Sequence, residues 1–196
     1  MSVTGRGRRE PKNPKSCHER ALGLLAVRPR TRRELERRLL GAGFEPTEVD
    51  DVLGRLESVG LVDDRAFAEQ FAEHQFGNRL AGRRAVTSGL LAKGVSPTIA
   101  AGVAADGLVE EAARAEQLAR ARALRMSGLE PAKAFGRLTS LLLRRGYPPD
   151  VARFAARRAL HLDASDDGAL LSPVSRGRSI GSTRGRPIEK FNEDDP

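Results

Sequence analysis

The chain of 196 residues has little cysteine, few aromatic residues and no long apolar runs, and each shortage excludes a class of protein. A single cysteine, Cys17, rules out a framework of internal disulfides and favours a reducing compartment. Tryptophan is absent and aromatic residues make up 4% of the chain, which favours helices packed through small aliphatic side chains over a sheet. No apolar run approaches the roughly 18 residues of a membrane-spanning helix. The N-terminus has no apolar signal segment either, so we expect a cytoplasmic protein.

What the chain has in excess is positive charge. Its net charge of +8 and isoelectric point near 10.6 indicate a polyanionic partner, or a partner that holds a polyanion. Nearly all the cations are arginine, since lysine occurs only at Lys12, Lys15, Lys93, Lys133 and Lys190. Forks for binding phosphate would explain this bias, but a GC-rich genome produces the same excess. We therefore interpret only the sign of the charge.

Three segments of the chain repeat one pattern. The sequences LLGAGFEP, LLAKGVSP and LLRRGYPP begin at residues 39, 90 and 142. Six positions keep the same register, at spacings of 51 and then 52 residues: Leu35, Leu39, Leu40, Gly43, Phe44 and Pro46; Val86, Leu90, Leu91, Gly94, Val95 and Pro97; Leu138, Leu142, Leu143, Gly146, Tyr147 and Pro149. A fixed period near 50 residues is typical of a repeat architecture, in which each unit buries one face against the next.

Each repeat unit is predicted to contain three short helices. Apolar spacing, capping residues and prolines place them at residues 18–27, 31–41, 46–59, from 64 past 75, 82–93, 97–105, 109–126, 131–145 and 149–161. In the repeated hinge, a glycine such as Gly94 ends one helix in the left-handed conformation, and Ser96 caps the next helix, which starts at Pro97.

Local sequence signals predict details of three of these helices. Thr31 and Glu34 have the spacing of a reciprocal capping box, and Asp64 is the expected cap of the fourth helix. Gly89 interrupts the fifth helix at a cost of about 1 kcal/mol relative to alanine, so we expect that helix to be irregular or frayed.

The fold class is therefore all-α, with three tandem units between two tails. Residues 1–16 form a basic tail, and residues 163–196 combine glycine, serine and arginine with an acidic end. Neither tail can bury enough apolar surface to offset its ordering entropy, so we expect both to be disordered. The predicted repeats occupy residues 17–62, 63–107 and 108–162.

Charge is unevenly distributed along the array. The segment 21–62 has seven basic and seven acidic residues, and the segment 63–107 has five of each. The segment 108–160 has 11 basic and five acidic residues, which leaves it alone with a net charge of +6. The third unit is therefore expected to face a polyanion.

Two groups of arginines are candidate contacts to such a ligand. In the second unit, Arg79, Arg83 and Arg84 lie at the connection between two predicted helices. In the third unit, Arg144 and Arg145 end one predicted helix, and Arg153 and Arg157 lie one turn apart on the next. A solvated helix face explains any one of them, and the helix dipole alone favours cations where a helix ends, as at Arg144 and Arg145.

No motif of catalysis is recognisable. The three histidines, His18, His74 and His161, are far apart and have no second ligand at metal-binding spacing. Aspartates at helix starts are typical caps, and Phe67 and Phe71 have the spacing of a core pair rather than of a base-stacking surface. Glycine loops for phosphate and nucleophile elbows are also missing. We expect no enzyme, no metal site and no cofactor.

Four motifs together resemble the RecX family of bacterial recombinase regulators. They are RTRRELERRLLGAGF (30–44), SVGLVDDRAFAEQF (58–71), GRRAVTSGLLAKGV (82–95) and LTSLLLRRGYPPDVARFAARRAL (138–160). The resemblance covers about residues 17–162. It implies three tandem three-helix repeats in an elongated, curved array.

The resemblance also implies a partner, the RecA recombinase assembled on single-stranded DNA. Proteins of this family lodge in the groove of that filament and suppress its ATPase, strand-exchange and coprotease activities. The seven arginines would then contact nucleic acid or the filament, and the protein would act as a monomer. Two alternatives stay open: a repeat protein that acts through DNA alone, and a helical scaffold that binds protein without salt dependence.

Overall fold

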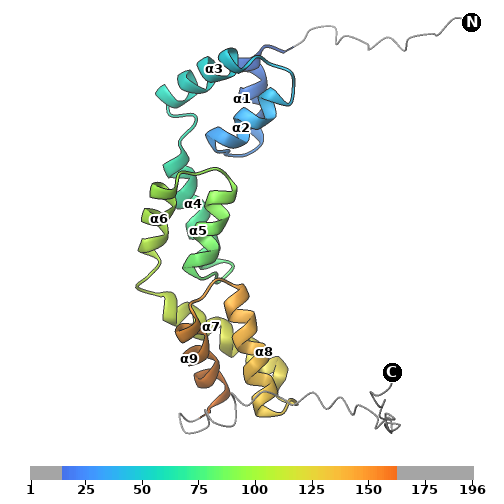
Figure 1. Ribbon diagram of the computed structural model, residues 1–196, viewed down its shortest axis with the longest axis vertical. Helices are drawn as coiled ribbons and strands as arrows, with labels where there is room; N and C mark the ends of the chain where they lie inside the picture. The colour runs from blue at the N-terminus through green and yellow to red at the C-terminus, as the bar shows by residue number, and fades with distance from the viewer. Residues whose placement is uncertain (1–14, 163–196) are drawn as a thin grey trace, which may run out of the picture.

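The computed structural model describes residues 15–162, which form nine α-helices and one short 3₁₀ helix and no strand (Figure 1). The helices form three groups of three that follow one another along the long axis, so the described part of the molecule is elongated and curved (Figure 1). The predicted all-α array of three-helix repeats is confirmed. The predicted tails, residues 1–16 and 163–196, lie almost entirely outside the described residues.

The first unit consists of α1 (Cys17–Val27), α2 (Arg32–Leu40) and α3 (Pro46–Ser58). A capping box begins α1, because Ser16 Oγ accepts from the N–H of Glu19 and the Glu19 carboxylate accepts from the N–H of Ser16. The apolar faces of the three helices form one core: Cys17, Ala21, Leu35, Leu39, Val49, Val52, Leu53, Leu56 and Val62.

The second unit consists of α4 (Asp64–Gly77), α5 (Arg83–Ala92) and α6 (Pro97–Asp106). Its core is built from small side chains, with Phe67 and Phe71 packed against its edge as the sequence predicted. The two rings stack at 6.4 Å between centroids, and Lys93 Nζ lies 5.6 Å from the Phe67 centroid.

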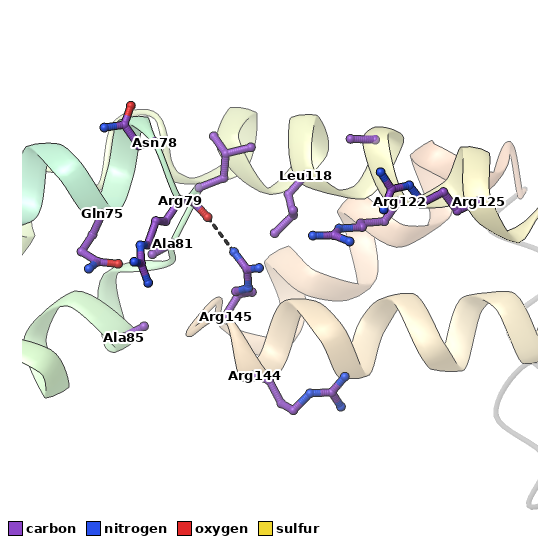
Figure 2. A pocket seen from close by; sticks show the side chains of 12 residues that line it. Gln75, Asn78, Arg79, Ala81, Ala85, Leu118, Arg122, Arg125, Arg144 and Arg145 are labelled. Atoms are coloured by element: carbon purple, nitrogen blue, oxygen red, sulfur yellow. Dashed lines mark hydrogen bonds between the residues drawn. The ribbon is translucent and has the colours of Figure 1, made fainter.

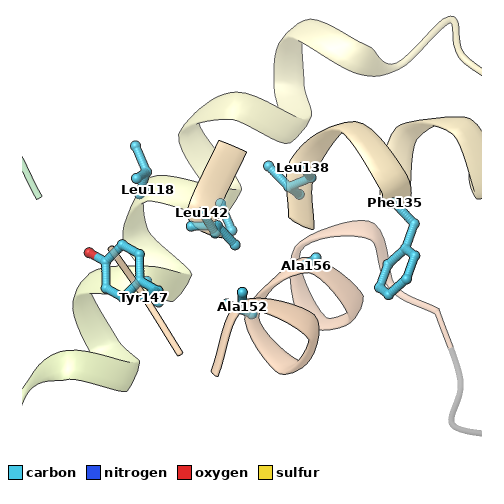
Figure 3. Close-up of a cluster of buried hydrophobic side chains, with 10 residues drawn as sticks. Leu118, Phe135, Leu138, Leu142, Tyr147, Ala152 and Ala156 are labelled. Carbon is cyan, nitrogen blue, oxygen red and sulfur yellow. The ribbon is translucent and has the colours of Figure 1, made fainter. Parts of the chain in front are cut away.

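The third unit consists of α7 (Glu111–Ala123), a 3₁₀ turn (Leu124–Met126), α8 (Pro131–Arg144) and α9 (Pro149–Leu160). Its core is the largest of the three: Ala115, Leu118, Ala119, Phe135, Leu138, Leu142, Tyr147, Ala152, Ala155 and Ala156 (Figure 3). Alanines on α9 let that helix approach α7 closely, which packs the basic unit tightly.

The repeated hinge has the predicted geometry in all three units. Gly43, Gly94 and Gly146 have φ of 94°, 87° and 87°, the left-handed conformation that side chains disfavour. Ser96 Oγ accepts from the N–H of Ile99 and so caps α6, as predicted.

Three local predictions are wrong. The cap of α4 is Asp63, which accepts from the N–H groups of Arg65 and Ala66, while Asp64 is the first helical residue. Thr31 caps α2 through the N–H of Glu34, but the Glu34 carboxylate pairs with Arg28 and Lys93 and does not complete the box.

The third wrong prediction is that Gly89 makes the fifth helix irregular or frayed. The helix α5 continues without a break past this residue. A Cβ on Gly89 would lie 2.9 Å from Cζ of Phe71, so a larger residue there would have to displace the ring.

Neighbouring units are joined by the same hydrogen bond at both joints. The N–H of Arg32, at the start of α2, donates to Asp64 Oδ1 at 2.8 Å. The N–H of Arg83, at the start of α5, donates to Glu111 Oε1 at 2.8 Å. In each case a free N–H of a helix start pairs with an acidic residue that begins the next unit. Burial raises the pKa of Asp64, and the Arg32 N–H partly offsets this effect.

The two joints differ in the rest of their contacts. At the second joint the backbones meet directly: the N–H of Gly82 donates to the Arg145 carbonyl at 2.8 Å, and the N–H of Arg84 donates to the Gly146 carbonyl at 3.3 Å. At the first joint side chains make the contact, because Thr31 Oγ1 donates to the Lys93 carbonyl at 2.6 Å and Lys93 Nζ lies 3.2 Å from Glu34.

Candidate nucleic-acid interface

A groove of about 670 Å³ lies at the second joint, between the end of α4, one face of α7 and the end of α8 (Figure 2). Five arginines line it, and we call it the arginine groove: Arg79, Arg122, Arg125, Arg144 and Arg145. No carboxylate is among its lining residues. The groove therefore gathers five cations where nothing of opposite charge lines the wall.

The turn after α4 determines the position of Arg79. Leu80 has φ of 47°, an uncommon conformation for a leucine, and Tyr147 Oη donates to its carbonyl at 2.8 Å. Arg145 Nη1 donates to the Arg79 carbonyl at 2.7 Å, drawn as the dashed line in Figure 2. These two bonds hold the turn against the third unit, so the guanidinium of Arg145 is held in place before any ligand binds.

Tyr147 is buried among the core residues beneath this turn. Burial raises its pKa to about 12, a shift that the nearby Arg114 opposes. The hydroxyl therefore stays protonated and able to donate throughout the physiological pH range.

Arg122 and Arg125 come from the C-terminal part of α7 and the 3₁₀ turn. Together with Leu118 and Ala121 they follow the helical spacing of three or four residues, which places them on one face. The acidic residues of α7 are engaged elsewhere: Glu116 pairs with Arg120 and Arg158, and Glu111 accepts from the N–H of Arg83. Within the described part of the chain, no groove arginine forms an ion pair.

The sequence predicted three of these five arginines. Arg79, Arg144 and Arg145 line the groove, whereas Arg122 and Arg125 were missed. These two arginines belong to the run ARARALR at 119–125, and the sequence alone does not distinguish one arginine of this run from another. The packing of α7 distinguishes them. Arg120 pairs with Glu116 on the outer surface, whereas the other two arginines face the groove.

The other four predicted arginines lie outside the groove. Arg83 and Arg84 line a separate hollow of about 390 Å³ with Thr87, Ser88 and Leu91. On α9, Arg153 is exposed, and the guanidinium carbon of Arg157 lies 6.0 Å from the Phe135 ring centroid. Their role as contacts to nucleic acid or to a filament stays a prediction.

Within residues 15–162, no group of three or more histidine, cysteine, aspartate or glutamate side chains could hold a metal ion. Burial raises the pKa of the Cys17 thiol, and Glu48 adds to this effect, which keeps the thiol protonated. No helix in this range is both long and apolar enough to cross a bilayer.

Known proteins resemble this chain in sequence and in fold. The family model for the first three-helix domain of RecX matches residues 17–56, and that for the second matches residues 63–103. The regulatory protein RecX of Mycobacterium ulcerans is 40% identical over 146 residues, which cover 73% of this chain and 84% of that protein. The regulatory protein RecX of Mycobacterium tuberculosis H37Rv is 40% identical over 139 residues, or 67% and 78% of the two chains.

Two solved structures share the fold. The crystal structure of RecX from Lactobacillus salivarius superposes with a TM-score of 0.65 at 20% identity, covering 73% of this chain and 94% of that one. A second crystal structure, of a regulatory protein RecX, gives a TM-score of 0.64 at 20% identity over 71% and 69% of the two chains. The sequence identity to the mycobacterial proteins, the two matched domains and the shared fold show that this chain belongs to the RecX family of regulatory proteins.

Proposed function

We propose that this protein binds the filament that the RecA recombinase forms on single-stranded DNA and inhibits its ATPase, strand-exchange and coprotease activities. The protein catalyses no reaction in this proposal and acts by occupying the filament. Family membership supports the regulatory role. The arginine groove is the observation on this chain that supports contact with a nucleoprotein.

The elongated array suits a partner that is itself a polymer. Stacked units present a surface that extends along one direction, so one molecule can contact several neighbouring protomers of a helical filament. A compact protein of the same mass would reach fewer of them. Each helix is short, with the 14 residues of α8 spanning about 21 Å, so this reach comes from stacking rather than from one long helix.

The groove arginines are proposed to bind DNA phosphates. A guanidinium is planar and always charged, and its N–H groups match the oxygens of a phosphate. Binding also relieves the repulsion between the five clustered cations. Contacts from three to five arginines predict a slope of log affinity against log salt of roughly −2 to −3.5 for single-stranded DNA. Arg83, Arg84, Arg153 and Arg157 would extend the contact along the second and third units.

A direct test measures DNA-dependent ATP hydrolysis by RecA while the full-length protein is titrated in. We expect inhibition at less than one molecule per recombinase protomer, together with shorter filaments in electron micrographs. If a large excess leaves both hydrolysis and filament length unchanged, the proposal is wrong.

The groove also favours a second function, binding of DNA without the recombinase. That function predicts the same affinity for single-stranded DNA whether or not recombinase is present. Filament inhibition predicts a higher affinity for the assembled filament than for either component alone. A pull-down at several salt concentrations against recombinase, DNA and their complex separates the two.

A further inference from the structure

A second hollow lies at the first joint, between α2 and the end of α5, with a volume of about 540 Å³. Its apolar part includes Ala92 and two leucines, Leu40 and Leu91, which occupy the same position in two successive repeats. They are 40% and 42% exposed, whereas the preceding leucines, Leu39 and Leu90, are fully buried. We call this site the leucine hollow. Its size falls in the range of about 300–1,000 Å³ in which protein pockets enclose a drug-sized group.

The polar wall of the leucine hollow carries both signs of charge. Arg33, Glu36 and Arg37 lie with Leu40 on one face of α2, because they are three or four residues apart. Glu34 also lines the hollow, but Arg28 at 3.0 Å and Lys93 at 3.2 Å already pair with it. Burial opposes the ionisation of Glu34, yet these two hydrogen-bonded cations prevail and lower its pKa.

The charges that remain available to a ligand are therefore two arginines and one glutamate. Neither Arg37 nor Glu36 forms an ion pair within the described residues. The aliphatic part of Arg33 packs over Gly94, where any Cβ would collide with it, so this arginine is held in place. Because Arg33 and Arg37 outnumber Glu36, the available charge is net positive. Together with two half-exposed leucines, this charge matches an apolar side chain that lies beside a carboxylate.

The carboxylates in this wall disfavour a nucleic-acid backbone. The available carboxylate of Glu36 would face its phosphates, whereas the arginine groove at the other joint has no acidic residue in its lining. The two joints therefore present different chemistry, although they occupy equivalent places in the repeat. The hollow at the first joint suits a protein surface, and the groove at the second joint suits phosphates.

We propose that the leucine hollow is the docking site for the recombinase protein, and that it receives a large apolar side chain flanked by an acidic one. This inference rests on the proposed function and adds that the two joints bind different parts of the filament. The first joint binds the recombinase protein, and the second joint binds the DNA.

The test compares one variant of the full-length protein with a matched control. Leu40→Ser removes one of the two leucines of the hollow without adding charge, and Leu91 is left unchanged because it also lines the separate hollow of Arg83 and Arg84. Leu143→Ser is the control, because Leu143 occupies the same repeat position and is 42% exposed but does not line this hollow. Affinity is measured for the recombinase–DNA filament and, separately, for single-stranded DNA.

Leu40→Ser is expected to bind the filament about tenfold more weakly and to bind DNA as the wild type does. The Leu143→Ser control is expected to stay within about twofold of the wild type on the filament. Wild-type affinity for the filament in Leu40→Ser would overturn the inference, and so would an equal loss in the control. Failure of the wild-type protein itself to bind the filament would instead refute the proposed function.

Circular dichroism melting establishes whether the Leu40→Ser variant folds. If it does not, Arg37→Glu replaces it, since Arg37 is exposed on α2 and its reversal repels the acidic partner. The same selective loss of filament binding is expected, and unchanged filament binding by Arg37→Glu would equally overturn the inference.

Discussion

Gly82 lies so close to the backbone of Gly146 that there is no room for a side chain on Gly82. A Cβ on Gly82 would collide with the backbone of Gly146, and a Cβ on Gly146 would collide with the backbone of Ala85. The N–H of Gly82 donates to the carbonyl that precedes Gly146 in the chain, at 2.8 Å. Backbone therefore packs on backbone where the second unit meets the third, directly beside the arginine groove.

Gly82→Ala is expected to lower the free energy of unfolding by about 1–3 kcal/mol, because the added methyl group overpacks this contact. The φ of Gly82 is −80°, which alanine adopts without strain, so the effect isolates the close approach. Urea denaturation measures it. Gly136→Ala is the matched control: Gly136 lies inside α8 with nothing within 4 Å of an added Cβ, and the variant should gain up to about 1 kcal/mol. Equal effects in the two variants would contradict the contact.

Gly89→Ala tests whether Phe71 explains the glycine within α5. Alone, the variant should be less stable by about 1 kcal/mol, because the clash with the ring exceeds the gain in helix propensity. In a Phe71→Leu background, where the ζ carbon is gone, the same substitution should become neutral or stabilising. A double-mutant cycle measures this coupling, and simple additivity would show that the ring is not the cause.

Arg122→Gln and Arg125→Gln should each weaken binding of single-stranded DNA by about two- to fivefold and reduce the magnitude of the salt slope by about 0.7. Fluorescence anisotropy at several salt concentrations measures both quantities. Arg120→Gln is the control on the same helix, because Arg120 pairs with Glu116 at 2.7 Å outside the groove. Equal losses in all three variants would indicate that only net charge matters.

Tyr147 is the single tyrosine of a chain without tryptophan, so its ultraviolet titration reports on one known site. We expect tyrosinate absorbance to appear with a midpoint near the pKa of about 12, not near 10. Because the folded pKa is raised, the stabilisation is complete below the unfolded pKa near 10 and is lost as pH rises from there through about 12. An ordinary midpoint near 10 in the folded protein would contradict the buried hydroxyl.

Tyr147→Phe should remove that alkaline loss of stability. At neutral pH it should cost about 1–2 kcal/mol, since the carbonyl of Leu80 loses its hydrogen-bond donor. Thermal melting at neutral and alkaline pH compares the variant with the wild type, and parallel pH profiles would argue against the assignment.

The repeat register made most of the fold predictable. Each unit packs three helices around one core, so the same residue types recur at a fixed interval. They include buried leucines, such as Leu39, Leu90 and Leu142, and glycines in the left-handed conformation, such as Gly43 and Gly94. Capping is less specific at the level of sequence: Asp63 and Asp64 are adjacent and chemically identical, and only the N–H of Arg32 in the preceding unit assigns their separate roles.

The candidate site was only partly predictable, since a groove depends on contacts between units. The sequence places Arg79 and Arg145 66 residues apart, and their hydrogen bond exists because the turn at Leu80 meets the end of α8. Similarly, the Phe71 ring explains Gly89 only once α4 packs on α5. Contacts between residues this far apart in the chain do not affect the local sequence pattern, so the sequence alone does not predict them.

The contrast between the joints has a mechanical consequence. Where main chains interlock, at Gly82 and Gly146, relative rotation would break hydrogen bonds that no side-chain rearrangement can replace. Where Thr31 and Lys93 mediate the contact, rotamer changes can absorb small rotations. We therefore expect the first joint to bend more readily than the second, so that the second and third units keep a fixed orientation relative to each other while the first unit moves.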